Sequence, residues 1–80
     1  MRIPRDWSGD ELIKRLKKLG YEPTRQSGSH VRLTRSIGET EHHLTVPRHG
    51  ALRVGTLNGI LKDVAAHLGE SKEEVLLALQ

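Results

Sequence analysis

"HVRLTRSIGETEHHLTVP", residues 30–47, contains two segments in which apolar and polar side chains alternate. Successive side chains of a β-strand point to opposite faces, so each segment predicts a strand with one buried face. Residues 36–39, Ser-Ile-Gly-Glu, predict a hairpin turn between the two strands. The side chains expected to face the core are Val31, Leu33, Leu44 and Val46.

The residues before this hairpin predict a helix and one more strand. Ser8 and Glu11 have the spacing of a capping box, which marks the start of a helix. Gly20 is expected to end that helix in a left-handed conformation. Residues 21–26 then predict a weaker strand, and Pro23 places it at a sheet edge because proline has no N–H to donate.

The residues after the hairpin predict two further helices. The first runs from Val54 or Gly55 to Leu68, because its apolar residues recur at helical spacing. A second capping box, formed by Ser71 and Glu74, opens a short C-terminal helix.

These elements predict one α+β domain over residues 1–80, in the order α-β-β-β-α with a short C-terminal helix. Helices are expected to cover one face of a three-stranded antiparallel sheet and to leave the other face open to water. By strand alternation, His30, Arg32 and Thr34 lie on the open face.

Composition narrows the class of partner. The 80 residues include 13 Lys and Arg against 10 Asp and Glu, which gives a net charge of +3 and favours an anionic partner. Trp7 and Tyr21 are the only aromatic residues, which disfavours proteins that stack single-stranded bases on aromatic side chains. There is no apolar run of the ~18–20 residues that cross a membrane, and no signal peptide, so we expect a cytoplasmic protein.

No metal site is predicted. Cysteine is absent, which excludes thiolate ligands and thiol nucleophiles. His42 and His43 are adjacent on a strand and therefore point to opposite faces, which is poor geometry for a shared metal. His67, in the last turn of its helix, is expected to have a structural or solvent role. No cofactor is expected.

Three motifs in register carry a resemblance to a known family. They are Gly28-Ser29-His30, Val46-Pro47-Arg48-His49, and Gly55-Thr56-Leu57 followed by Ile60-Leu61-Lys62. In this order and spacing they resemble the HicA family of toxins, from the first helix to about Leu68. The resemblance implies a fold similar to double-stranded-RNA-binding domains. It also implies an mRNA interferase of a type II toxin–antitoxin system, neutralised by a HicB-like antitoxin, and matches His30 to the family's catalytic histidine.

Two features depart from the family pattern. The segment Ser71–Gln80 extends beyond the tail of many members. The lysine-rich motif with which double-stranded-RNA-binding domains hold phosphates is absent, since Arg53 is the only cation just before the second long helix. A similar fold therefore does not imply stable binding of duplex RNA.

The residue types suit metal-independent RNA cleavage. RNA carries its own nucleophile, the 2′-hydroxyl, so scission needs a base near that oxygen and cations near the phosphate. Histidine has an ordinary pKa of about 6.5 and can accept a proton near neutral pH. Gly28 allows the RNA backbone to approach closely. The predicted substrate-binding residues are Gly28, Ser29, Arg25, Arg32, Arg35, Arg48 and His49, with His30 as the catalytic base.

Two other functions use the same surface. A non-catalytic RNA-binding module would use His30 as one more contact, and cleavage of a purified transcript separates it from the enzyme. A protein-interaction domain would bind a partner through the open face or a sheet edge without any effect on RNA.

Overall fold

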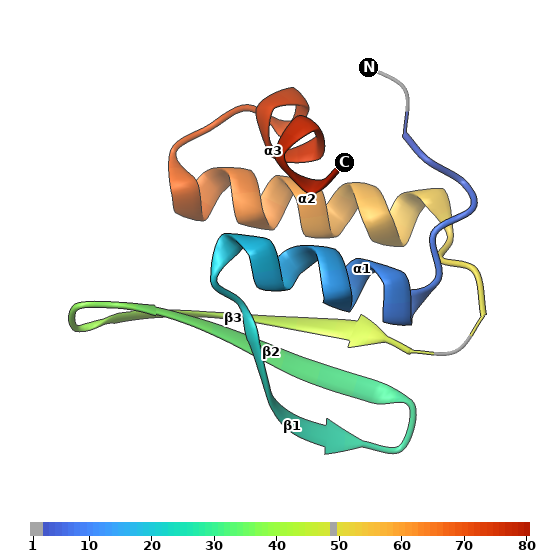
Figure 1. Cartoon of the computed structure of the whole chain (residues 1–80), viewed down its shortest axis with the longest axis horizontal. Helices are drawn as coiled ribbons and strands as arrows, with labels where there is room; N and C mark the ends of the chain where they lie inside the picture. The colour runs from blue at the N-terminus through green and yellow to red at the C-terminus, as the bar shows by residue number, and fades with distance from the viewer. Residues whose placement is uncertain (1–2, 49) are drawn as a thin grey trace.

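The computed structural model describes residues 3–48 and 50–80, and it has the predicted α+β architecture (Figure 1). The elements, in chain order, are α1 (Gly9–Leu16), the 3-10 helix η1 (Lys17–Leu19), β1 (Glu22–Ser27), β2 (His30–Ile37), β3 (Thr40–Pro47), α2 (Val54–Leu68) and α3 (Lys72–Leu79). Among the described residues, no helix is both long enough and apolar enough to cross a membrane.

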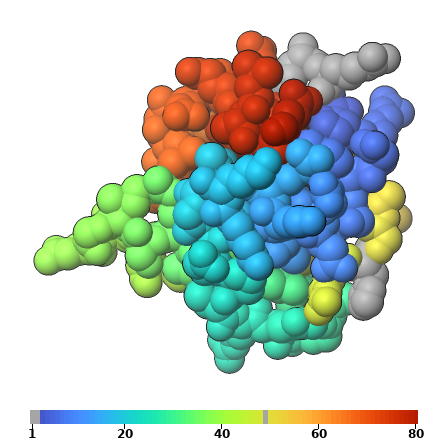
Figure 2. Space-filling model, viewed as in Figure 1, coloured from blue at the N-terminus to red at the C-terminus, as the bar shows by residue number. Residues whose placement is uncertain are grey.

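The sheet is antiparallel, with strand order β1-β2-β3. β2 and β3 pair without interruption from His30 opposite Pro47 to Ile37 opposite Thr40. The tip of this hairpin projects beyond the helices (Figure 2). β1 is an edge strand, as Pro23 predicts, and its register against β2 shifts between Pro23 and Arg25.

The helices cover one face of the sheet and enclose the core. α1 and α2 lie against this face, and α3 packs on the far side of α2 (Figure 1). The four hairpin residues expected to face the core are all buried, which confirms the alternation. The largest side chains that are fully buried are Tyr21, Leu12, Leu16, Leu33, Leu57, Leu61 and Leu79.

The two predicted capping boxes differ. At α3 both halves form, because the Ser71 hydroxyl accepts from the Glu74 N–H and the Glu74 carboxylate accepts from the Ser71 N–H. At α1 the Ser8 hydroxyl accepts from the Glu11 N–H at 3.1 Å, but the Glu11 carboxylate turns to Arg15 at 2.9 Å. The first capping box is therefore only half formed, because an ion pair one turn further along α1 takes its carboxylate.

Thr34 is less exposed than the sequence predicts. It lies on the face of the sheet away from the helices, as expected, yet only 9% of it is exposed to water. Its hydroxyl is hydrogen-bonded to the hydroxyl of Thr24 at 2.9 Å and to Nδ1 of His43 at 2.9 Å. Neighbouring side chains on β1 and β3 thus cover Thr34 within a face that is otherwise exposed or partly exposed to water.

Candidate active site

His30 is the first residue of β2, and it is exposed. It pairs with Ser27 on β1 and with Pro47 on β3, so the ends of all three strands meet at this point. The tight turn before it places Gly28 at a φ of +59°, a conformation that side chains disfavour. Nothing lies within 4 Å of the position that a Gly28 Cβ would occupy, so the turn is open to an approaching ligand.

Two arginines lie directly opposite each other beside His30. Arg25 on β1 pairs with Arg32 on β2, and Arg32 lies two residues from His30, on the same face. Among the described residues, neither guanidinium has a hydrogen bond or an ion pair. Like charges directly opposite each other destabilise a sheet. The pair is therefore suited to an anion that bridges both cations.

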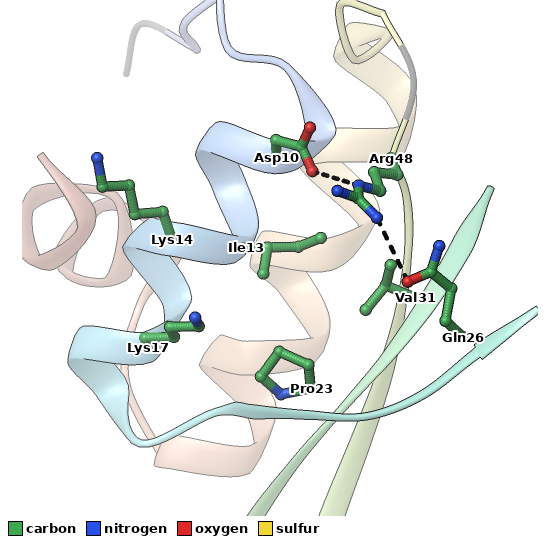
Figure 3. Close-up of a pocket in the computed structure, with 8 residues that line it drawn as sticks. All are labelled: Asp10, Ile13, Lys14, Lys17, Pro23, Gln26, Val31 and Arg48. Atoms are coloured by element: carbon green, nitrogen blue, oxygen red, sulfur yellow. Dashed lines mark hydrogen bonds and ion pairs between the residues drawn. The ribbon is translucent and has the colours of Figure 1, made fainter.

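Arg48 joins the end of β3 to the turn that carries His30. Its backbone N–H donates to the carbonyl of Ser29 at 2.6 Å. Its side chain donates to the Asp10 carboxylate at 2.8 Å and to the Gln26 side-chain oxygen at 3.4 Å (Figure 3). The Gln26 amide in turn donates to the carbonyl of Gly28 at 3.1 Å. These bonds fix the turn from both sides.

The first turn of α1 is in direct contact with the same end of the sheet. A Cβ added at Gly9 would overlap the carbonyl oxygen of Pro47 and the Cα of Arg48. The loop between β3 and α2 is also attached to the start of α1, because the Leu52 N–H donates to the carbonyl of Trp7 at 2.9 Å. Gly9 therefore lets the helix approach the backbone that carries Arg48.

Arg35 lies on the other face of the sheet. Its Nε donates to the carbonyl of Leu19 at 2.7 Å, and its terminal nitrogen donates to Nε2 of His67 at 3.2 Å. The structure therefore does not bring Arg35 together with His30, and its predicted contact with substrate has no geometric support. The sequence alternation that points Arg32 outward points Arg35 inward.

His42 on β3 and His67 on α2 form a compact group near Arg35. The ring of His42 stacks on that of His67, with centroids 4.4 Å apart, and its Nδ1 is hydrogen-bonded to the Tyr21 hydroxyl at 2.8 Å. Burial lowers the pKa of His42, and the nearby charge of His67 lowers it further. Burial also raises the pKa of Tyr21. His67, for which a structural or solvent role is expected, therefore takes part in packing within the fold.

The remaining site predictions have different outcomes. Ser29 lies in the turn before His30 and is partly buried, while His49 falls outside the described residues. Asp10 and Gln26, which hold Arg48, were not predicted, because each is far from Arg48 in the sequence. Within residues 3–48 and 50–80, no three His, Asp or Glu side chains are grouped so that they could hold a metal ion.

A model of the family described as "HicA toxin of bacterial toxin-antitoxin" matches residues 9–65. The chain belongs to the HicA toxin family. The match runs from the start of α1 into α2 and includes the whole sheet, so the resemblance predicted from the three motifs is confirmed. No curated protein and no solved structure matches the chain. As a HicA toxin it is one component of a toxin–antitoxin system, which implies an antitoxin partner.

Proposed function

We propose that this HicA toxin is a metal-independent endoribonuclease that cleaves mRNA, with His30 as the general base. The observation that carries the proposal is the position of His30 at the end of the sheet. It is exposed, and it lies on the same face as two arginines without a partner among the described residues. A base and an anion site are thus adjacent, which is the arrangement that cleavage by a 2′-hydroxyl requires.

The proposed reaction is an intramolecular displacement at phosphorus. His30 accepts the proton of the 2′-hydroxyl as that oxygen forms a bond to the phosphorus, and the bond from phosphorus to the 5′-oxygen breaks. The departing 5′-oxygen takes a proton and becomes a hydroxyl. Arg25 and Arg32 neutralise the charge that grows on the phosphate oxygens. The products are a 2′,3′-cyclic phosphate, or its hydrolysed form, and a free 5′-hydroxyl.

The neighbouring residues have supporting roles in this proposal. Gly28 gives the RNA backbone room at the turn, and Ser29 contacts it from the same turn. Arg48 holds the turn in place and keeps part of its guanidinium exposed for the substrate. His49 follows Arg48 in the chain and stays a predicted contact.

We also propose that a HicB-like antitoxin inhibits the enzyme by covering His30. The unpaired arginines beside His30 favour a partner that presents acidic groups, and such complementarity speeds association at low salt. A complex in which His30 stays accessible to RNA would contradict inhibition by occlusion.

The test is cleavage of a defined RNA by the purified toxin in the presence of EDTA. We expect cleavage with a 2′,3′-cyclic or hydrolysed 3′ end, and no cleavage when the scissile residue is 2′-deoxy. Cleavage of the deoxy substrate at full rate, leaving a 5′-phosphate, would show that water is the nucleophile. Loss of activity in EDTA, restored by a divalent ion, would overturn metal independence. Binding without any cleavage would favour an RNA-binding module.

A further inference from the structure

A groove of about 460 Å³ runs between α1 and β1, on the helix side of the sheet edge (Figure 3). We propose that this α1–β1 groove binds the phosphates of the RNA strand that extends from the cleavage site. The proposal rests on the proposed function, and it adds a second contact region to it. Asp10, Lys14 and Lys17 line the groove from α1, while Pro23 and Gln26 line it from β1.

The charge of the groove favours an anion. Lys14 and Lys17 are exposed, and no ion pair or hydrogen bond involves them among the described residues. Of the described residues that line the groove, only Asp10 is acidic, and it already pairs with Arg48 at 2.8 Å. The groove therefore has two uncompensated lysines on its α1 side, with the Lys17 side chain turned toward the other lining residues and the Lys14 side chain turned outward (Figure 3).

The groove leads directly to the turn before His30. At one end, Arg48 and Gln26 line it, and these residues bond to the carbonyls of Ser29 and Gly28. A strand with its scissile phosphate on the open face therefore reaches the groove by crossing the β1–β2 turn. That turn is formed by Gly28 and Ser29, and the space around Gly28 is open. β1 would then separate the phosphate held by the arginines from those held by the lysines.

The lining favours a nucleic-acid backbone over stacked bases or a protein strand. The apolar part of the lining comes from Ile13, Pro23 and Val31. Among the described residues no aromatic side chain lines the groove, so bases have no ring there on which to stack. Residues three apart on a helix are about 5–6 Å apart at Cβ, close to the spacing of successive phosphates. Pro23 and the register shift beside it interrupt β1, which disfavours addition of a strand from another protein.

The test compares two double variants of the full-length toxin with the same net charge. Lys14→Gln with Lys17→Gln removes both groove cations. The control, Lys18→Gln with Lys62→Gln, removes two exposed lysines that do not line the groove. Binding is measured over a range of salt concentrations with RNA that carries a 2′-deoxy scissile residue, as a dinucleotide and as an oligonucleotide extended on either side. Circular dichroism checks that both variants are folded.

For the groove variant we expect weaker binding of one of the extended RNAs and unchanged binding of the dinucleotide. Each phosphate contact to a single strand contributes about 0.7 to the slope of log K against log salt, so losing two contacts lowers the slope by about 1.4. The corresponding loss of affinity at 0.1 M salt is on the order of 10- to 30-fold. The control should keep the wild-type slope to within about 0.3.

Equal changes in the two double variants would overturn the proposal, because they would reflect net charge alone. A loss that is equal for the dinucleotide and the extended RNAs would overturn it as well. Normal RNA binding with weakened antitoxin binding would assign the groove to the protein partner instead. Because the RNA is not cleaved in this assay, the outcome is separate from whether wild-type toxin cleaves the ribose form.

Discussion

Both faces of the sheet carry arginine and histidine side chains, but the two faces differ in whether these side chains are exposed and whether they have hydrogen-bond partners. Arg32 and Arg35 are three residues apart on β2, yet Arg32 has no side-chain partner in the described part of the chain, whereas Arg35 bonds to Leu19 and His67. His30 is exposed on the open face, while His42 stacks against another ring under α2. Strand alternation and the helices above one face therefore decide whether a charged group stabilises the fold or stays available for a ligand.

The open face keeps an arrangement that costs stability. Cross-strand pairs contribute roughly 0.2–1 kcal/mol, and like charges such as Arg25 and Arg32 contribute with the unfavourable sign. A bridging phosphate would reverse that sign, because each guanidinium would then gain a charge-assisted hydrogen bond. In the described part of the chain, the covered face has no such unpaired arginine, which is consistent with a structural role.

The largest effect is expected at His30. His30→Ala should abolish growth arrest and lower the rate of RNA cleavage by about 10²–10⁴, the usual contribution of a general base. Because the side chain is exposed, the free energy of unfolding should change by no more than about 0.5 kcal/mol. Growth curves at matched expression and single-turnover cleavage assays measure the first effect, and urea unfolding measures the second.

His43→Gln is the matched control for this variant. His43 lies on the same face but pairs with Thr34, far along β2 from His30, and glutamine can still bond to the Thr34 hydroxyl. We expect cleavage close to that of the wild type. A His30→Ala protein that is as toxic as the wild type would refute the catalytic assignment.

The two arginines of β2 should separate activity from stability. Arg32→Gln should lower kcat/KM by about 10- to 100-fold, because a hydrogen bond to a charged group contributes about 1.5–3 kcal/mol. It should not reduce stability, since it relieves repulsion with Arg25. Arg35→Gln should instead reduce the free energy of unfolding by about 1–3 kcal/mol, because it leaves the Leu19 carbonyl unpaired.

Cleavage by Arg35→Gln, measured well below its unfolding transition, should stay near the wild-type rate. The reverse pattern, with activity lost in Arg35→Gln and kept in Arg32→Gln, would contradict the assignment of the two faces.

Most of the fold could be predicted because its signals are local. The alternation around Val31 and Leu44 defines the hairpin, and Ser71 marks the start of α3 through a bond to a residue three positions away. The capping box at Ser8 is only half formed, and the cause is also local, because Arg15 competes for the Glu11 carboxylate. A capping-box pattern in the sequence shows that the two hydrogen bonds can form. It does not show whether the glutamate carboxylate prefers the helix N-terminus or a nearby arginine.

The candidate site was less predictable because it depends on long-range contacts. Arg48 bonds to Asp10, 38 residues away, and to Gln26, 22 residues away, and no local pattern connects them. The position of His30 on the open face could be predicted from its motif and from strand parity. The charge of Arg35 predicts a contact with substrate, but strand parity places its side chain on the covered face.

A pair of glycine substitutions tests how firmly α1 is held against the end of the sheet that carries the site. Gly9→Ala should destabilise the protein by about 1–3 kcal/mol, since its Cβ would overlap the backbone of Pro47. Gly59→Ala, in α2, has open space around the new methyl group and should stabilise by up to about 1 kcal/mol. Thermal and urea unfolding of both variants measure the difference, and the same sign for both would contradict this packing.

The smallest effect is a pH dependence that belongs to the covered face. His42 faces Tyr21, Arg35, and both Asp63 and His67 of α2, and His43 is its neighbour on β3. Its pKa is lowered from the ordinary value of 6.5, mainly by burial and then by the charge of His67, so the folded state favours the neutral ring. Above pH 6.5 the ring is mainly neutral in both states and contributes no pH dependence.

As the pH falls through 6.5, the unfolded chain takes up the proton before the folded chain does, so stability decreases until the pH passes the lowered pKa of His42. The slope for one proton is at most about 1.4 kcal/mol per pH unit. His42→Gln should therefore flatten the loss of unfolding free energy as the pH falls from 6.5 toward the lowered pKa of His42, as measured by urea unfolding. His43→Gln, on the open face, should change that loss much less, because the charge of His43 is a smaller cause of the lowered pKa of His42 than burial. If the two variants have the same pH profile, the burial of His42 is not the cause, and the two faces do not differ in this respect.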